Sequence, residues 1–430
     1  MAALPFRAPV LRPSDAGCPP YDAFEGYFAR DGHPAAAPGS LLDLPAARRW
    51  FDLLRWGYEE DLYTYQQPLE GRSGPRVSVA GRPILMLASY DYLGLLGCPA
   101  VEEAAVAAVR AYGTGTGGVR MLTGTMVLHH ELERELAAFK GVEAALTFGS
   151  GYLANLAVIG ALVGPRDRVI IDARAHRSLH DACLLARVPV QTFRHNDPAT
   201  LRQELEREAA GRRTLIVVDG LYSMDGDICP LPEIVAVKRE FGALLLVDEA
   251  HSLGVLGESG RGVHEHFGLP ADAVDIWTGS LSKAIPANGG FLAGSRELVI
   301  YLQHMTAPFW FSAALCPAAV GAALEALRVL RREPTRLGRL RRNAALLRDG
   351  LRSRGYDTGA SAGPIIPVIV GTNEAAWRLA RRLFDRGVMA PAVVYPAVPP
   401  DAARLRLCAT AAQSQTHLDE ALAAFEGARG

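Results

Sequence analysis

Lysine is scarce in this chain of 430 residues. Lys140, Lys238 and Lys283 are the only lysines, so 42 of the 45 basic residues are arginines. In such a chain the few lysines either stand where an amine has a role that a guanidinium cannot fill, or they simply reflect the base composition of the coding sequence. An amine can lose its proton and form a Schiff base, which a guanidinium cannot do. The count therefore marks three positions to inspect and decides nothing more.

Other absences exclude whole classes of protein. The chain has 45 basic and 46 acidic residues, so no positive excess indicates binding to nucleic acid or to an anionic membrane surface. No apolar run reaches the roughly 18 residues of a membrane span. The first residues show no charged segment followed by a long apolar stretch, so no signal peptide is expected. Six scattered cysteines without a close pair predict reduced thiols in a cytoplasmic protein, not disulfides or a zinc site.

What is present is enough apolar sequence for a large packed core. Hydrophobic residues make up 49% of the chain and charged residues 21%, and the length suggests two or three lobes at roughly 150 residues each. Residues 1 to 45 are rich in Pro, Ala and Gly and predict a loose arm. An aromatic helix and loop over 44–66 and a hairpin around Ala80-Gly81-Arg82 follow. We predict an arm and short subdomain over 1–88, a large domain over 89–311 and a small domain over 312–430.

The middle of the chain alternates short apolar strands with helices. The predicted strands are 168–172, 214–219, 243–248 and 275–279, and helices such as 232–241 separate them. Nearly continuous apolar strands that alternate with helices indicate a mainly parallel sheet buried on both faces. From about Ser312 two long helices, a strand at 365–370, a helix at 374–386 and a strand at 404–408 predict a smaller α+β lobe. Ligands of open α/β sheets bind at the carboxyl ends of the strands, where several of these strands end in Asp.

Two formal motif matches carry little information. Residues 113–118 satisfy the dinucleotide pattern G-x-G-x-x-G, but they follow a predicted helix, 99–112, where the fingerprint requires a strand. Residues 280–283 satisfy the S-x-x-K pattern of acylating serine hydrolases. That chemistry needs a companion Lys-Thr-Gly, and no lysine here precedes a threonine.

Lys283 and Asp248 both follow predicted strands. Lys283 lies in a loop of small residues, which lets the backbone and an amine approach a bulky planar ligand, although a lone loop lysine is ordinarily a solvated one. Lys140 and Lys238 lie in charged helical patterns and are expected on the surface. Asp248 closes an apolar strand, where a carboxylate is costly unless paired. It either caps a helix or forms an ion pair, or it holds the protonated nitrogen of a pyridine ring.

Further residues extend this pattern. Gly149-Ser150-Gly151-Tyr152 precedes an apolar helix, and amides at a helix N-terminus bind phosphate readily. His176 follows the strand that ends at Asp172, and its imidazole either stacks on a ring or is an ordinary polar loop residue. An amine, a pyridinium partner, a phosphate site and a stacking ring together are what a pyridoxal 5′-phosphate (PLP) enzyme needs.

With these residues in view, the chain resembles the α-oxoamine synthase family of PLP-dependent enzymes from about Ser89 to Leu422. The motifs that carry the resemblance lie in order along the chain. They are residues 89–95 (SYDYLGL), 112–118 (YGTGTGG), 122–125 (LTGT), 193–197 (FRHND), 222–227 (YSMDGD), 248–252 (DEAHS), 260–262 (GRG) and 282–284 (SKA). The Ser-Tyr-x-Tyr-Leu-Gly form is most typical of the serine palmitoyltransferase branch.

The resemblance implies a PLP fold type I homodimer and assigns roles by motif position. Lys283 matches the Schiff-base lysine, Asp248 the pyridinium partner and His176 the stacking histidine. The other matches are Gly151 and Tyr152 for contacts to the cofactor, Ser223 and His251 for its O3′ side, Ser280 for its phosphate and Arg406 for the amino-acid carboxylate. We expect Lys283, His176, Asp248 and His251 to be catalytic, Arg406 and Tyr90 to contact substrate, and no metal to take part.

The implied reaction is a decarboxylative Claisen condensation. A small amino acid (Ser, Ala or Gly) attacks an acyl thioester of CoA or of an acyl-carrier protein, and an α-aminoketone, CO2 and a free thiol result. Three departures from the family pattern bear on the substrate: Tyr90 where several members have Asn, Pro286 for Gly and Gln413 for His. The alternatives are an aminotransferase or aldolase on the same scaffold, or a regulatory subunit without activity, which the presence of Lys283 disfavours.

Overall fold

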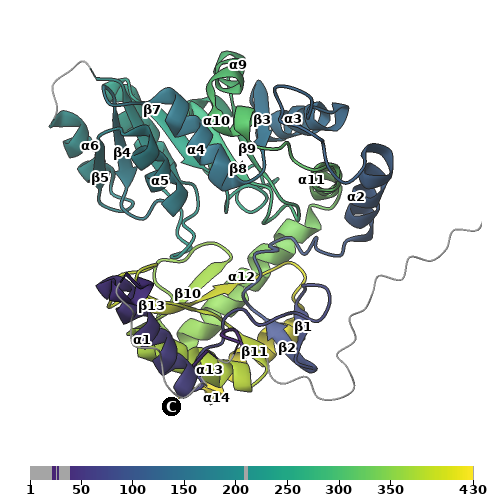
Figure 1. Ribbon diagram of the computed structural model, residues 1–430, viewed down its shortest axis with the longest axis vertical. Helices are drawn as coiled ribbons and strands as arrows, with labels where there is room; N and C mark the ends of the chain where they lie inside the picture. The colour runs from purple at the N-terminus through teal and green to yellow at the C-terminus, as the bar shows by residue number, and fades with distance from the viewer. Residues whose placement is uncertain (1–21, 26, 29–38, 208–211, 430) are drawn as a thin grey trace, which may run out of the picture.

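The computed structural model describes residues 22–25, 27–28, 39–207 and 212–429, so most of the predicted N-terminal arm lies outside the described residues. Figure 1 shows two lobes, one above the other. The upper lobe is built on a seven-stranded sheet and the lower lobe on two three-stranded sheets. Helix α12 (Thr335–Ser353) joins them, because Leu337 and Leu340 pack in the core of the upper lobe, and Leu347 and Leu351 in that of the lower.

The large sheet has the strand order β3-β9-β8-β7-β6-β4-β5. In that order the strands are β3 (Ala144–Phe148), β9 (Gly290–Gly294), β8 (Ile276–Ser280), β7 (Leu244–Asp248), β6 (Thr214–Asp219), β4 (Arg168–Asp172) and β5 (Val190–Phe193). All neighbours from β8 to β5 pair in parallel, whereas β9 pairs antiparallel with both β3 and β8. The predicted mainly parallel sheet is confirmed.

Strand β9 is the strand of this sheet that is hardest to predict from its sequence. It reads Gly-Phe-Leu-Ala-Gly, and its first residue belongs to a glycine pair that favours a loop. The glycine is required here because a Cβ at Gly290 would lie 2.3 Å from the backbone nitrogen of Gly151. The strand therefore passes directly against the start of helix α4 (Gly151–Leu162).

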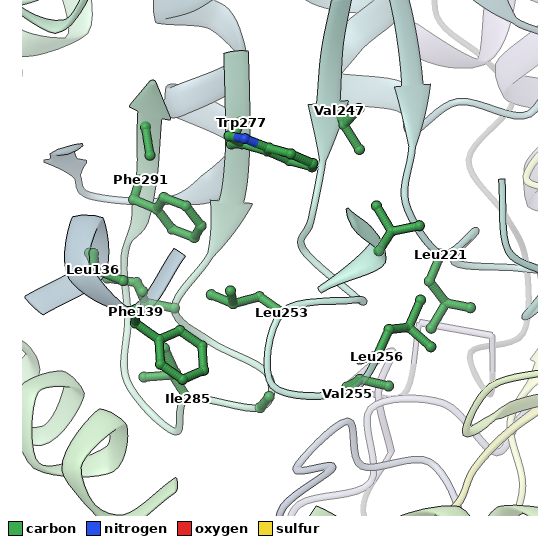
Figure 2. Close-up of a cluster of buried hydrophobic side chains, with 14 of the residues drawn as sticks. Leu136, Phe139, Leu221, Val247, Leu253, Val255, Leu256, Trp277, Ile285 and Phe291 are labelled. Carbon is green, nitrogen blue, oxygen red and sulfur yellow. The ribbon is translucent and has the colours of Figure 1, made fainter. Parts of the chain in front are cut away.

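Successive residues of each central strand enter different cores. In β4, Ile170 packs in one hydrophobic cluster, while Val169 and Ile171 pack in the other. This alternation explains the continuous apolar strands, because both faces of the sheet are covered by helices. Figure 2 shows part of one core, where Trp277 and Phe291 from adjacent strands face Leu136 and Phe139 of α3.

Two sets of helices cover the two faces. One core contains residues of α2 (Pro99–Tyr112), α3 (Val127–Lys140), α6 (Pro198–Glu206), α7 (Leu231–Phe241), the short α8 (Val263–His266) and α11 (Pro317–Arg332). The opposite core contains residues of α4, α5 (Arg177–Ala186), α9 (Arg296–Met305) and α10 (Ala307–Phe311). A 3-10 turn, η2 (Ala271–Ala273), precedes β8.

The lower lobe combines the C-terminal segment with residues near the N-terminus. One sheet has the order β10-β13-β12 and the other the order β1-β2-β11. Their strands are β10 (Ile365–Gly371), β13 (Ala403–Cys408), β12 (Ala392–Val393), β1 (Arg76–Val79), β2 (Arg82–Met86) and β11 (Val388–Met389). The helices of this lobe are η1 (Leu41–Asp43), α1 (Pro45–Glu59), α13 (Asn373–Asp385) and α14 (Gln415–Gly427), besides the second half of α12.

The N-terminal hairpin has the expected tight turn. Ala80 and Gly81 both have positive φ, of 49° and 70°, which is the backbone that a two-residue hairpin turn requires. Strand β2 pairs in parallel with β11, about three hundred residues later, and Trp56 of α1 stacks on Trp377 of α13 with ring centroids 5.6 Å apart. The first described helix and hairpin therefore form part of the lower lobe.

The predicted divisions at residues 88 and 311 remain predictions, but the packing of α11 bears on the second one. Helix α11 packs on α2 and α3, and its apolar residues, such as Val320, Leu324 and Leu327, are buried in the core of the large sheet. A residue before α12 is therefore a better boundary than residue 311. The apolar sequence of α11, compared with the arginine-rich α12, is the signal that could have indicated this boundary.

The prediction that Lys140 and Lys238 lie on the surface is wrong. The side chain of Lys140 is 1% exposed and pairs with Glu249, and Lys238 is half-buried and pairs with Asp275 at 2.7 Å. Cys98, Cys183, Cys229, Cys316 and Cys408 are free thiols. Among the described residues, no helix has the length and apolar character needed to cross a membrane.

Candidate active site

Side chains of the predicted site meet where the parallel strands end. Asp172, Asp219 and Asp248 are the last residues of β4, β6 and β7, and Ser280 ends β8. Asp219 pairs in register with Asp248, which in turn pairs with Thr278. Three carboxylates and the loop that carries Lys283 therefore share one edge of the sheet.

Lys283 lies in the turn between the antiparallel strands β8 and β9. The backbone of Leu281 donates a hydrogen bond to Gly289 at 2.9 Å, which closes the turn. No hydrogen bond or salt bridge joins Nζ of Lys283 to any residue in the described part of the chain, and the Tyr90 ring centroid lies 5.8 Å from Nζ. Burial lowers the pKa of this amine, while the negative charge of Asp248 acts in the opposite direction. The side chain of Lys283 is partly buried, which disfavours the alternative that it is a solvated loop residue.

Asp248 is buried and held in place on both oxygens. Oδ1 accepts the backbone N–H of Ala250 at 2.8 Å, and Oδ2 accepts Nδ2 of Asn155 at 2.7 Å. Asn155 also donates to the Ser178 hydroxyl at 2.8 Å, whereas its own Oδ1 is buried without a hydrogen-bond partner in the described residues. Of the two structural alternatives from the sequence, neither a helix cap nor an ion pair describes this carboxylate.

Asn155 was missed in the sequence. The signal that could have revealed it is a single buried amide inside the otherwise apolar helix α4. A buried polar side chain in such a helix needs a partner, and here the partner is the carboxylate at the end of β7.

His176 is the N-cap residue of helix α5 and lies beside this group. Its Nδ1 shares a hydrogen bond of 2.7 Å with the Ser178 hydroxyl, and its backbone N–H donates to Asp219 at 3.2 Å. Asp248, Asn155, Ser178 and His176 thus form one chain of hydrogen bonds. The imidazole lines a cavity of about 920 Å³, whose walls also include Ser223, Trp50, Trp377 and Val394.

His251 follows β7 and is close enough to Lys283 to feel its charge. Its Nδ1 forms a hydrogen bond of 2.8 Å with the hydroxyl of Tyr92, and both side chains are buried. Burial, and then the positive charge of Lys283, lower the pKa of His251 well below the usual range. The imidazole is therefore neutral at physiological pH.

Arg406 enters the site from the lower lobe on β13. Its Nε donates to the backbone carbonyl of Ser223 at 2.6 Å and its Nη1 to Sγ of Cys408 at 3.3 Å. No carboxylate of the described residues forms a salt bridge with Arg406, in contrast to the neighbouring Arg404, which pairs with Asp225 at 2.8 Å. A partly buried guanidinium without a carboxylate partner suits an anionic ligand.

The predicted phosphate contacts lie at the start of α4. A Cβ at Gly151 would lie 3.1 Å from the carbonyl oxygen of Gly279 and 3.2 Å from Cβ of Ser280, so the helix N-terminus touches the end of β8. The Ser280 hydroxyl shares a hydrogen bond of 2.7 Å with that of Ser282. Tyr152 is exposed, and its hydroxyl donates to Asp181 at 2.6 Å.

All ten predicted site residues therefore lie around the sheet edge or on the segments that face it. The residues fit PLP because an unpaired amine, a fixed buried carboxylate and a helix N-terminus are present together. The 113–118 loop follows α2 and no strand leads into it, which agrees with rejecting the dinucleotide pattern. In the described part of the chain, no group of acidic, histidine or cysteine side chains has the geometry of a metal site.

Comparison with known proteins places the chain in a family. The model of the aminotransferase class I and II family matches residues 82–425. The 8-amino-7-oxononanoate synthase of Thermoanaerobacter pseudethanolicus is 46% identical over 83% of this chain and 91% of the relative. That of Symbiobacterium thermophilum is 44% identical over 85% and 93%.

Solved structures agree with these relatives. A serine palmitoyltransferase variant from S. paucimobilis with a bound PLP–myriocin aldimine superposes with a TM-score of 0.87 at 32% identity, over 90% of this chain and 98% of that one. The Sphingomonas wittichii serine palmitoyltransferase gives a TM-score of 0.84 at 35% identity, over 88% and 97%. The predicted PLP fold type I is confirmed. The chain belongs to the aminotransferase class I and II family and, within it, to the α-oxoamine synthases, the PLP-dependent C-acyltransferases that condense an amino acid with an acyl thioester and release CO2.

Proposed function

We propose that the amino acid used by this chain is L-alanine and that the acyl group is a seven-carbon ω-carboxyacyl (pimeloyl) thioester. The support is the product named for the relatives that are 44–46% identical, 8-amino-7-oxononanoate. In that product carbon 8 is the α-carbon of alanine and carries the amine, and carbon 9 is the methyl group of alanine. Carbon 7 is the former thioester carbonyl, and carbons 1 to 7 come from the acyl group.

We assign the roles at the site by combining motif position with geometry. PLP, when bound, supplies an electron-poor ring that stabilises negative charge on the α-carbon of the amino acid. Lys283 holds the cofactor and receives the α-proton at Nζ, Asp248 keeps the ring nitrogen protonated and His176 stacks on the ring. Gly151, Tyr152 and Ser280 contact the phosphate end, and Ser223 and His251 the O3′ side.

Arg406 binds the amino-acid carboxylate, and Tyr90 borders the substrate over Lys283. A planar guanidinium binds a carboxylate through two parallel hydrogen bonds, and no described carboxylate competes for Arg406. The lowered pKa of Lys283 favours a neutral amine that can accept a proton. The observation that carries this assignment concerns the ε-amine of Lys283: it is close enough to the fixed carboxylate of Asp248 to feel its charge, and it has no hydrogen-bond partner among the described residues.

A substrate matrix tests the proposal. Holoenzyme is incubated with alanine, serine or glycine and with pimeloyl or palmitoyl thioesters, each as the CoA ester and as the acyl-carrier-protein ester, and products are identified by mass. We expect the aminoketone, CO2 and free thiol from alanine with a pimeloyl donor. A preference for serine with palmitoyl thioester would contradict the substrate assignment. Amino-group transfer to a keto acid without release of thiol would contradict the reaction class.

We also propose that two copies of the chain pair over the surface near residues 118–127. Leu122, Val127 and Phe311 are 74%, 69% and 84% exposed. The backbones of Val119 and Ala313 form an isolated bridge, so these apolar side chains belong to neighbouring segments. Light scattering should give the mass of a dimer, and Phe311→Asp should shift it toward the monomer. A cytoplasmic location, predicted from the cysteine spacing, stays part of this proposal.

A further inference from the structure

His195 is a partly buried titratable residue that the proposed reaction does not use. It follows β5 in the turn that leads to α6 and lies between two carboxylates. Its Nδ1 is 2.8 Å from Oδ1 of Asp172, and its Nε2 is 2.7 Å from Oδ2 of Asp227. The rings of His195 and Tyr222 are nearly perpendicular, with centroids 4.5 Å apart.

The hydrogen bonds around His195 require its charged form. Asp172 already accepts the backbone N–H groups of Arg174 at 2.8 Å and Asn196 at 2.9 Å, and Asp227 accepts the side-chain amide of Asn196 at 3.0 Å. Both carboxylates therefore act as acceptors. A neutral imidazole has one donor and one acceptor nitrogen, so one ring nitrogen would face an oxygen lone pair. Only the imidazolium donates on both sides.

The charges nearby favour that form. Asp172 and Asp219 face His195 from the ends of β4 and β6, and Asp227 faces it from the 222–227 turn. Burial acts to lower the pKa of His195, but the bonds to Asp172 and Asp227 outweigh it and raise the pKa to about 9. The second oxygen of Asp227, Oδ1, is buried without a hydrogen-bond partner among the described residues, so His195 is the main compensation for this charge.

Asp227 closes the 222–227 turn, which extends from the large lobe to the lower lobe. Its carbonyl accepts the backbone N–H of Tyr222 at 3.0 Å, and Tyr222 accepts that of Gly226 at 2.9 Å. At the outer end of this turn the carbonyl of Ser223 accepts Nε of Arg406, and that of Met224 accepts Arg404 at 3.1 Å. The turn is thus anchored to the large sheet through Asp227 and to the lower lobe through two arginines.

We propose that the His195 imidazolium is a positioning residue: by holding Asp227 against Asp172 it fixes the 222–227 turn, and the turn fixes Arg406 for the substrate carboxylate. The role assigned to Arg406 belongs to the proposed function, on which this inference rests. His195 is not among the residues assigned above to substrate or cofactor. Its contribution is complete below about pH 6.5, the ordinary value, and is lost as the pH rises through about 9.

The first test reads the protonation of His195 without any turnover. Holoenzyme with 15N-labelled histidine is titrated by NMR, and the His195 signals are assigned by their loss in His195→Gln. We expect both ring nitrogens to be protonated at pH 7.5 and to titrate near pH 9. A neutral ring at pH 7.5 would overturn the proposal. Because this readout is independent of the reaction, it stands or falls separately from the substrate assignment.

The second test separates positioning from general structure by kinetics. His195→Gln should raise KM for the amino acid at least about tenfold, as the loss of one pKa unit of interaction would, with a smaller change in kcat. In the native enzyme KM for the amino acid should rise above pH 9. In Asp227→Asn this rise should disappear, because a neutral His195 can donate to Asp172 and accept from the amide at position 227.

The control is His304→Gln. His304 lies on the exposed face of α9, and its ring forms a hydrogen bond with the carbonyl of Ile300. This variant should leave KM and its pH dependence unchanged. Identical alkaline profiles for the native enzyme and Asp227→Asn would overturn the proposal, as would an unchanged KM in a folded His195→Gln variant.

Discussion

Lys140 is buried and Lys283 is partly buried in the same lobe, and the two lysines differ in their partners. Nζ of Lys140 contacts Oε1 of Glu249 at 2.5 Å, the carbonyl of Arg261 at 3.0 Å and Nδ1 of His264 at 2.9 Å, and it lies 3.4 Å from the Trp277 ring centroid. Nζ of Lys283 has no hydrogen-bond partner in the described residues. Burial lowers the pKa of both amines, that of Lys140 to about 8.

The difference shows that burial alone does not identify a reactive amine. Each N–H of a buried ammonium needs an acceptor, and Lys140 has a carboxylate, a carbonyl and a ring nitrogen around it. Lys283 lacks these partners, so its amine remains available for a ligand. Its hydrogen bonds make Lys140 a structural lysine, whereas Lys283 remains the lysine proposed to be catalytic.

The largest effect is expected at Lys283. We predict that Lys283→Ala lowers turnover about ten-thousandfold or more, because both covalent attachment of the cofactor and proton transfer are lost. Borohydride reduction followed by peptide mass analysis checks the attachment. Native protein should carry the reduced cofactor on the Lys283 peptide only. A reduced adduct on Lys140 or Lys238 in the variant, or turnover at the native level, would contradict the prediction.

The next effect concerns stability at Lys140. Lys140→Met leaves Glu249 buried without its cation, and we expect a loss of about 3–5 kcal/mol in the free energy of unfolding. Urea unfolding of the cofactor-free protein measures it. Lys238→Met is the matched control: its pair with Asp275 is half-buried and should contribute at most about 1 kcal/mol. Equal losses of unfolding free energy in the two variants would show that Lys140 contributes no more to stability than Lys238.

The smallest effect is a difference in reaction rate between the two amines. In cofactor-free protein, reductive methylation should modify Lys283 at least about a hundredfold faster than Lys140, because exposing Lys140 requires roughly 2.8 kcal/mol or more of local opening free energy. Adding PLP should protect Lys283 and leave Lys140 unchanged. Comparable rates at the two lysines would mean that the Lys140 partners do not hold it.

Much of the large lobe could be predicted because its signals are local. Strands 168–172 and 214–219 are apolar runs that end in Asp, and the prediction matches β4 and β6 residue for residue. Lys283 and Asp248 could be found because a parallel sheet brings the residues after its strands to one edge. Their roles remain proposals, because motif position rather than a contact with cofactor assigns them.

The features that escaped prediction depend on residues far apart in the chain. Lys140 follows Phe139 at the end of a charged helix, and only Glu249, 109 residues later, makes its burial favourable. His195 belongs to the 193–197 motif, yet the charge proposed for its ring depends on contacts with both Asp172 and Asp227. Strand β9 packs against β8 because Gly279 leaves room for the Phe291 ring, from which a Cβ at Gly279 would lie only 2.6 Å, and neither segment alone predicts this contact.

The separation of Lys283 and Arg406 between two sheets has a consequence for selectivity. Lys283 belongs to the large sheet, and Arg406 to β13 of the lower lobe. In the proposed reaction an amino acid spans both, from its nitrogen to its carboxylate, so the binding free energy also depends on how far apart the lobes stand. A substitution in α12, which joins the lobes, can therefore alter the preference among alanine, serine and glycine without changing any side chain that the substrate meets.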